Sequence, residues 1–209
     1  MTRGIAALVV LVAVQSGDRP TQLPSAPPAV GETRVFIVRH AEKDTTVTSC
    51  PGGGTICQPL TSIGQARAEE LARLMKNQPL KKIYSTEYKR TQDTAKPSDR
   101  TPSIWASIPA REQLNTVAAE IAKEPGTYLI VTHSDVALAF LRKFIGEEIQ
   151  ITTGAMPSMA NVIDDPDYDN LFVLTLGPGN AKSCKLFYFG AKTGVDLAVT
   201  GCTTEGRVK

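Results

Sequence analysis

The stretch Arg34-Val35-Phe36-Ile37-Val38-Arg39-His40 decides the fold of this chain. Its central residues form an unbroken apolar, β-branched run, which is typical of a strand buried on both faces in a parallel sheet covered by helices. A second stretch, Tyr128-Leu129-Ile130-Val131-Thr132 followed by His133, has the same design. Together the two stretches predict buried strands whose carboxyl ends each lead into a histidine.

Helical and strand patterns alternate around these two stretches. The spacing predicts helices over 62–77, 87–95, 113–123 and 136–144, and further strands over 82–84, 171–176 and 185–189. In the first helix, with Thr61 or Ser62 as its cap, we expect one apolar face made of Ile63, Leu71, Leu74 and Met75. The alternation predicts an α/β fold: a three-layer αβα sandwich with a mostly parallel central sheet and an antiparallel strand at one edge, formed by the last hairpin.

The composition is that of one ordinary globular domain. The chain has 209 residues, of which 42% are hydrophobic and 21% are charged. These values exclude a disordered, collagen-like or multi-span membrane protein. The formal net charge of +2 is too small for a nucleic-acid footprint or a polybasic membrane arm, so we expect no nucleic-acid partner and only a local anion site.

The N-terminus has the anatomy of a signal peptide. Arg3 precedes an apolar run of about a dozen residues, shorter than the roughly 20 residues that a spanning helix needs. We expect a signal peptide over 1–16, a Pro-rich linker over 17–32 and the folded domain over 33–209. This organisation predicts a secreted or periplasmic protein with no stable membrane insertion after cleavage. An uncleaved anchor or a strand-like run are the alternatives.

The chain contains four cysteines, an even number that is compatible with disulfides in an exported protein. Three pairings are possible. The local pairs Cys50 with Cys57 and Cys184 with Cys202 need the least rearrangement of the chain, and four unpaired buried thiols are the alternative. The spacings do not match structural zinc modules.

The chain has only two histidines, and both follow buried-strand patterns. In open α/β sheets, ligands bind outside the carboxyl ends of the strands, so His40 and His133 stand where a site is expected. Arg39 precedes His40, and Arg90 lies early in the helix after strand 82–84. Either histidine alone would be interpreted as a core residue. Two imidazoles with two guanidiniums instead predict a phosphate cradle.

Five motifs occur in the order found in the histidine phosphatase superfamily, the phosphoglycerate mutase-like proteins, branch 1. They are Val38-Arg39-His40-Ala41-Glu42-Lys43, Leu60-Thr61-x-x-Gly64-x-x-Arg67-Ala68, Ile83-Tyr84-Ser85-Thr86 with Lys89-Arg90-Thr91-x-x-Thr94-Ala95, Val131-Thr132-His133-Ser134, and Tyr168-Asp169-Asn170-Leu171-Phe172-Val173. On these motifs, the chain from about Thr33 to Gly190 resembles a phosphatase-type member of the superfamily.

The resemblance implies a role for each matching residue. His40 would be the nucleophile that forms a phosphohistidine, while Arg39, Arg90 and His133 would hold the phosphoryl oxygens without a metal or cofactor. The remaining candidates are Glu112, Asp135 or no residue as the general acid, and Glu42 and Ser85 as further substrate-binding residues.

These expectations predict an exported, metal-independent phosphatase that hydrolyses a phosphomonoester, either a small-molecule phosphate ester or a phosphoprotein. The alternative is a catalytically silent phosphate-binding module of the same fold. A mutase fits less well, because the stretch that would carry its acid is short. A metal-binding protein also fits less well, because the chain has only two histidines and the motifs around them supply arginine rather than metal ligands.

Overall fold

The computed structural model describes residues 21–99, 105–153, 163, 166–194 and 196–208. The expected signal peptide and the start of the expected linker lie outside these ranges. Within the ranges, no helix has the length and apolar character needed to cross a membrane.

Strands and helices alternate along the described chain. The helices are α1 (Ser62–Met75), α2 (Lys89–Ala95), α3 (Ala110–Ile121) and α4 (Ser134–Phe144), with short 3-10 turns η1 (Lys96–Ser98) and η3 (Pro178–Asn180). The strands are β1 (Thr33–Arg39), β2 (Leu80–Ser85), β3 (Trp105–Ser107), β4 (Thr127–Thr132), β5 (Ile151–Thr153), β6 (Asn170–Leu176), β7 (Lys182–Tyr188), β8 (Leu197–Val199) and β9 (Thr203–Arg207).

Seven of the described strands form one sheet in the order β3-β2-β4-β1-β6-β7-β9, and β5 pairs with β8 separately. β1, β2, β3 and β4 run parallel, β6 runs antiparallel to both of its neighbours, and β7 pairs in parallel with β9. The predicted α/β class with a mostly parallel sheet is confirmed. The hairpin of β6 and β7 lies one strand further in than expected, because β9 covers its outer side.

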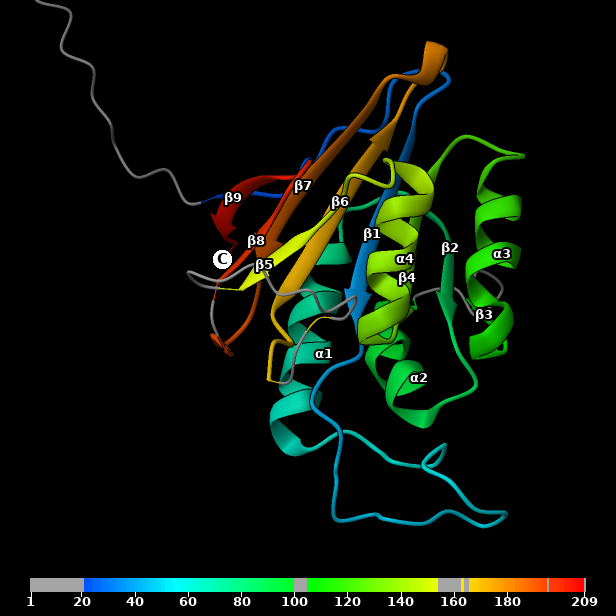
Figure 1. Ribbon diagram of the computed structural model, residues 1–209, viewed down its shortest axis with the longest axis vertical. Helices are drawn as coiled ribbons and strands as arrows, with labels where there is room; N and C mark the ends of the chain where they lie inside the picture. Colours follow the sequence, from blue (N-terminus) through cyan, green and yellow to red (C-terminus); the bar gives the residue numbers. More distant parts are fainter. Residues whose placement is uncertain (1–20, 100–104, 154–162, 164–165, 195, 209) are drawn as a thin grey trace, which may run out of the picture.

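Two hydrophobic clusters lie on opposite faces of the sheet. In β1, Val35 and Ile37 pack in the cluster that contains residues of α3 and α4, whereas Phe36 and Val38 pack in the cluster that contains residues of α1 and α2. Successive strand residues point to opposite faces, so an unbroken apolar run is what a doubly covered strand requires. Figure 1 shows the resulting three layers, with α4 in front of the sheet and α1 behind it.

Helix α1 begins where the sequence predicts, and Leu71, Leu74 and Met75 of the expected apolar face pack on the core, but Ile63 does not. Thr61 is its N-cap and its Oγ1 accepts a hydrogen bond from the Gly64 backbone N–H at 3.1 Å. The buried residues are Gly64, Arg67, Ala68, Leu71 and Met75. Ile63 was expected on this face and is 60% exposed. The expectation was wrong for Ile63 alone, because the close approach of its neighbour Gly64 to the backbone of Glu42 turns Ile63 to solvent.

Part of the expected linker packs against the domain. Thr21 pairs with Val208, which directly follows the edge strand β9, and Leu23 packs against the cluster on the α1 side. Arg34 Nη1 donates to the Ala26 carbonyl at 2.6 Å.

Both local disulfides are present, and no described cysteine is free. Cys50–Cys57 closes a loop after β1, and Cys184–Cys202 ties β7 to the residue before β9. The predicted pairing is therefore confirmed.

Candidate active site

The sheet topology brings the two histidines together. β1 and β4 are parallel neighbours in register from Arg34 with Thr127 to Arg39 with Thr132, so the residues that follow them emerge side by side. The His40 backbone N–H donates to the Thr132 carbonyl at 2.8 Å and continues this ladder by one residue. The two imidazole centroids lie 5.6 Å apart in an edge-to-face arrangement. The predicted juxtaposition at the carboxyl edge of the sheet is thus present.

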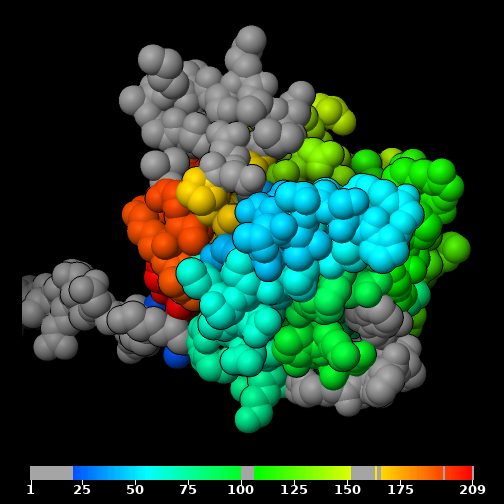
Figure 2. Space-filling view, turned by 90° about the horizontal axis from the view of Figure 1, so that it is seen from below, coloured from blue at the N-terminus to red at the C-terminus, as the bar shows by residue number. Residues whose placement is uncertain are grey.

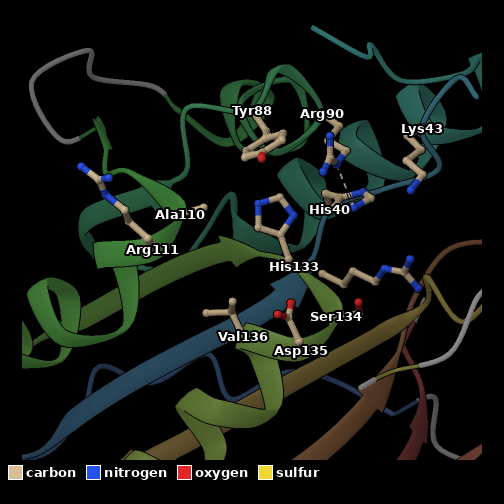
Figure 3. A pocket seen from close by; sticks show the side chains of 11 residues that line it. His40, Lys43, Tyr88, Arg90, Ala110, Arg111, His133, Ser134, Asp135 and Val136 are labelled. Atoms are coloured by element: carbon tan, nitrogen blue, oxygen red, sulfur yellow. Dashed lines mark hydrogen bonds between the residues drawn. The ribbon is translucent and has the colours of Figure 1, made fainter. Parts of the chain in front are cut away.

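A pocket of about 490 Å³ opens at this edge. Its described lining includes all four predicted cradle residues, Arg39, His40, Arg90 and His133, together with Lys43, Tyr88, Ala110, Arg111, Ser134, Asp135 and Val136. Figure 3 shows the imidazoles of His40 and His133 facing one another beneath Tyr88 and Arg90. Figure 2 shows the segment after β1 spread over this end of the molecule.

The hydrogen bonds of His40 determine its tautomer. Its Nδ1 lies 2.8 Å from the Ala41 carbonyl, which can only accept, so Nδ1 carries the hydrogen. Its Nε2 lies 3.2 Å from Nε of Arg90, which can only donate, so Nε2 carries the lone pair. Burial, reinforced by the positive charges of Arg39 and Arg90, lowers the pKa of His40 to about 2. His40 therefore presents an unprotonated nitrogen to the pocket at neutral pH.

His133 is held by a chain of hydroxyl groups. Its Nε2 is 3.1 Å from Oγ1 of Thr86, which in turn is 2.7 Å from Oγ1 of Thr91. Burial and, to a lesser degree, the positive charge of Arg90 lower the pKa of His133 to about 4. The ring is thus a neutral hydrogen-bonding group above that pH, and it is oriented by Thr86, which Thr91 of α2 holds in turn.

Each arginine of the cradle lies over a tyrosine ring. The guanidinium carbon of Arg90 is 4.3 Å from the ring centroid of Tyr88, and that of Arg39 is 4.3 Å from the ring centroid of Tyr168. Such cation–π contacts orient a long side chain while leaving its N–H groups available in the ring-parallel plane. Burial lowers the pKa of Arg90, yet a guanidinium stays charged at any relevant pH. Sequence reasoning assigned no role to either tyrosine.

This geometry and the sequence agree with a known family. Residues 35–115, which contain Arg39, His40 and Arg90, match the family model described as histidine phosphatase superfamily (branch 1). The matched segment, residues 35–115, is therefore similar to the histidine phosphatase superfamily, as the motifs predict. A search of curated proteins finds no match.

Solved structures share the fold of this chain. The protein histidine phosphatase SixA complexed with tungstate superposes with a TM-score of 0.52 at 15% identity, covering 73% of this chain and 94% of that one. Mycobacterial hydrolase 1 superposes with a TM-score of 0.51 at 14% identity, covering 79% of this chain and 100% of that one. A mycobacterial glucosyl-3-phosphoglycerate phosphatase superposes with a TM-score of 0.50 at 14% identity, covering 83% of this chain and 99% of that one. At these identities the likeness concerns the fold.

Three residues that the sequence suggested are not among the described residues that line the pocket. Glu42 turns to Arg67, whose Nε and Nη2 donate to its carboxylate at 2.9 and 2.7 Å. Ser85 is fully buried, and its Oγ donates to the Thr86 carbonyl at 3.3 Å. Glu112 pairs with Arg111 at 3.3 Å, and its side chain is 53% exposed. Glu42 and Ser85 therefore support the walls of the site, and Glu112 faces solvent.

Charge in the pocket is strongly one-sided. Lys43 and Arg111 add two cations to the cradle, and Figure 3 shows them on opposite sides of the two histidines. Asp135, in the first turn of α4, is the only carboxylate among the described lining residues. The described residues also contain no group of three or more His, Cys, Asp or Glu side chains that could hold a metal ion. The donor set suits an oxyanion such as phosphate.

Proposed function

We propose that the chain is an exported phosphatase that hydrolyses a phosphate monoester through a phosphohistidine intermediate on His40. The observation that carries the proposal is the Nε2 lone pair of His40, which lies inside a cationic pocket and is set by the Nδ1 contact to Ala41 and the Nε contact of Arg90. A nucleophilic imidazole must be unprotonated while its surroundings stay charged, and this site meets both conditions.

In the first step Nε2 attacks phosphorus in line with the leaving oxygen. The P–N bond forms, the P–O bond of the ester breaks, and the leaving oxygen takes up a proton. The imidazole gains positive charge as the bond forms, and the Ala41 carbonyl that accepts from Nδ1 stabilises this charge. Arg90 gives up its contact with Nε2 in the same event, which frees its Nε–H for a phosphoryl oxygen.

Arg39, Arg90 and His133 would hold the phosphoryl oxygens. The transition state of phosphoryl transfer spreads negative charge over these oxygens, so donors that are already oriented give most of the stabilisation. The tyrosine contacts and the hydroxyl chain on His133 provide that orientation. Because guanidiniums supply the charge, the proposed reaction includes no metal ion.

Asp135 is our candidate for the general acid. It lies in the pocket next to the second histidine motif, whereas Glu112, the first candidate from the sequence, points to solvent. Asp135 would protonate the leaving oxygen in the first step. In the second step it would accept a proton from the water that attacks phosphorus, breaks the P–N bond and releases inorganic phosphate.

Export is supported by the two disulfides, which form and persist in oxidising compartments, and by the apolar segment over residues 4–14. The substrate would be a small-molecule phosphate ester or a phosphoprotein presented outside the cytoplasm.

The test is hydrolysis of an aryl phosphate by the protein with excess chelator, beside His40→Ala and the remote control Arg73→Ala, an exposed arginine of α1. We expect turnover that survives chelation, is unchanged in the control and disappears in His40→Ala. Rapid quenching with labelled substrate should trap an acid-labile label on the wild type only. A folded wild type that binds phosphate without turnover would instead favour the silent binding module.

A further inference from the structure

The Cys50–Cys57 loop has little of its own to hold it in place. Residues 51–56 are all exposed, and Gly52, Gly53 and Gly54 have φ values of 89°, 87° and 73°, with nothing within 4 Å of where a Cβ would stand. Gly53 N–H donates to the Cys50 carbonyl at 2.8 Å, and Cys50 N–H donates to the Gly54 carbonyl at 3.1 Å. A loop with three glycines and no buried side chain between its cysteines has many conformations to lose, so the disulfide is its main constraint.

This loop nevertheless contacts the phosphate cradle directly. The Thr55 carbonyl accepts a hydrogen bond from Nη1 of Arg90 at 3.0 Å. The Ile56 carbonyl accepts from the backbone N–H of Lys89, the first residue of α2, at 2.8 Å. Tyr88, the N-cap of α2, makes no side-chain cap hydrogen bond. Two consecutive carbonyls of the loop therefore hold both the start of α2 and the guanidinium that α2 carries.

The two contacts of Arg90 are on different nitrogens. Nη1 points to Thr55 and Nε points to His40 Nε2, with the guanidinium over the ring of Tyr88. Because the guanidinium is planar, two hydrogen bonds on different nitrogens together with the stacked ring fix its orientation. When a phosphoryl group binds Nε, the contact of Nη1 with the Thr55 carbonyl remains in place. If the Thr55 carbonyl moves away, Arg90 loses this contact as well.

From these contacts we propose that the Cys50–Cys57 disulfide is a positioning device for Arg90. It fixes the Thr55 and Ile56 carbonyls so that the guanidinium is aimed at the phosphoryl group before substrate arrives. The proposal rests on the proposed function of Arg90 as a phosphoryl-binding residue. It assigns the disulfide a role in turnover beyond the stability that any cross-link gives.

The chain contains its own matched control. Cys184–Cys202 is the other disulfide, and its position on β7 is in register with Leu174 of β6, which pairs with Val35 near the start of β1. His40 follows the opposite end of β1. Removing this second disulfide deletes the same kind of bond at a place that touches neither Arg90 nor α2.

The experiment compares Cys50→Ser/Cys57→Ser with Cys184→Ser/Cys202→Ser, each alone and combined with Arg90→Ala. We measure kcat and KM for an aryl phosphate, the dissociation constant of inorganic phosphate by calorimetry, and the melting temperature. We expect kcat/KM to fall up to about 100-fold without Cys50–Cys57, the cost of misplacing a reacting group by about 1 Å. We expect much smaller loss without Cys184–Cys202, even if its melting temperature falls as far.

The combination with Arg90→Ala separates positioning from general damage. If the disulfide acts through Arg90, its removal has little further effect once Arg90 is absent. Wild-type kcat/KM in the loop variant, or an equal loss with and without Arg90, would overturn the proposal. If the loop variant does not fold, reduction of the folded Cys184→Ser/Cys202→Ser protein with dithiothreitol makes the same comparison.

Failure of the proposed function has a different signature. A wild type without turnover, with phosphate affinity that depends on Cys50–Cys57 and on Arg90 non-additively, supports the positioning role while contradicting the phosphatase. Phosphate affinity that is indifferent to the loop contradicts the positioning role whatever the turnover.

Discussion

His40 combines burial with a cationic neighbourhood, and this makes the stability of the fold depend on pH. Its folded pKa is about 2, that of His133 is about 4, and an unfolded histidine titrates near 6.5. Below pH 6.5 the unfolded chain therefore binds protons that the folded chain does not, and stability falls as the pH is lowered. We expect His40→Gln to reduce the pH dependence by about 1.4 kcal/mol per pH unit between roughly pH 6 and 4.5. Urea unfolding at each pH measures this.

His133→Gln serves as the comparison. The contribution of His133 to the pH dependence of stability should level off near pH 4, whereas that of His40 should extend below pH 4. Parallel stability curves for wild type and His40→Gln would mean that the imidazole is solvated enough to protonate in the folded state.

The proposed general-acid role of Asp135 is tested by varying the leaving group of the substrate together with the residue. An aryl oxide leaves without much protonation, whereas an alkoxide needs an acid. Only the first step depends on the leaving group, so the rate of phosphohistidine formation is measured by rapid quenching. We expect Asp135→Asn to reduce this rate by about 10²- to 10⁴-fold for an alkyl phosphate, with a much smaller effect for an aryl phosphate. Glu112→Gln, which changes a solvent-facing carboxylate, should leave both rates unchanged. An equal loss on both esters would assign Asp135 to substrate binding instead.

The residues of the cradle could be predicted from the sequence because each directly follows or opens a recognisable element. His40 and His133 end two apolar strands, and Arg90 opens a helix. Tyr88 and Tyr168 could not be assigned roles in the same way, since ring stacking on an arginine leaves no pattern along the chain. Glu42 was misplaced because its partner Arg67 lies on another element, in a contact that only the docking of α1 creates.

At the scale of elements, the docking of α1 depends on Gly64. A Cβ at this position would lie 2.3 Å from the Glu42 carbonyl oxygen, a backbone atom that cannot move without shifting the loop after His40. Glycine to alanine in a helix ordinarily stabilises by up to about 1 kcal/mol. Here we expect Gly64→Ala to destabilise by about 1–3 kcal/mol, the usual cost of overpacking, and to lower activity as well. Denaturant unfolding and turnover test both, and a gain in stability would contradict the packing argument.

The strands that the sequence predicts best are those with an unbroken run of apolar side chains. β1, β4 and β6 are buried apolar runs and were located to within a residue or two. β9, Thr203–Arg207, carries no apolar residue and was not predicted. It is held by backbone pairing to β7 and by the adjacent Cys184–Cys202 disulfide, neither of which appears as hydrophobic periodicity. This edge strand is the reason that the β6–β7 hairpin is internal.

For the whole molecule, the small net charge of +2 hides a strongly uneven distribution. Arg39, Lys43, Arg90 and Arg111 line one pocket with Asp135 as the only described opposing carboxylate. A cleft lined by one sign of charge concentrates the oppositely charged ligand and accelerates its capture, an effect that salt screens. An aryl phosphate dianion should therefore bind more slowly as ionic strength rises. We expect kcat/KM to fall while kcat stays nearly constant.

Substituting Lys43 and Arg111 tests whether these two side chains produce the electrostatic attraction of the pocket. We expect kcat/KM of the wild type to fall by about 10-fold as ionic strength rises from roughly 0.01 M to 1 M, where the screening length shrinks from about 30 to 3 Å. Lys43→Gln with Arg111→Gln should lower kcat/KM at low salt and flatten the salt dependence. Lys123→Gln with Lys182→Gln removes the same two charges from exposed positions at the end of α3 and the start of β7. If both pairs flatten the curve equally, capture follows net charge; if only the pocket pair does, the local placement of Lys43 and Arg111 steers the substrate.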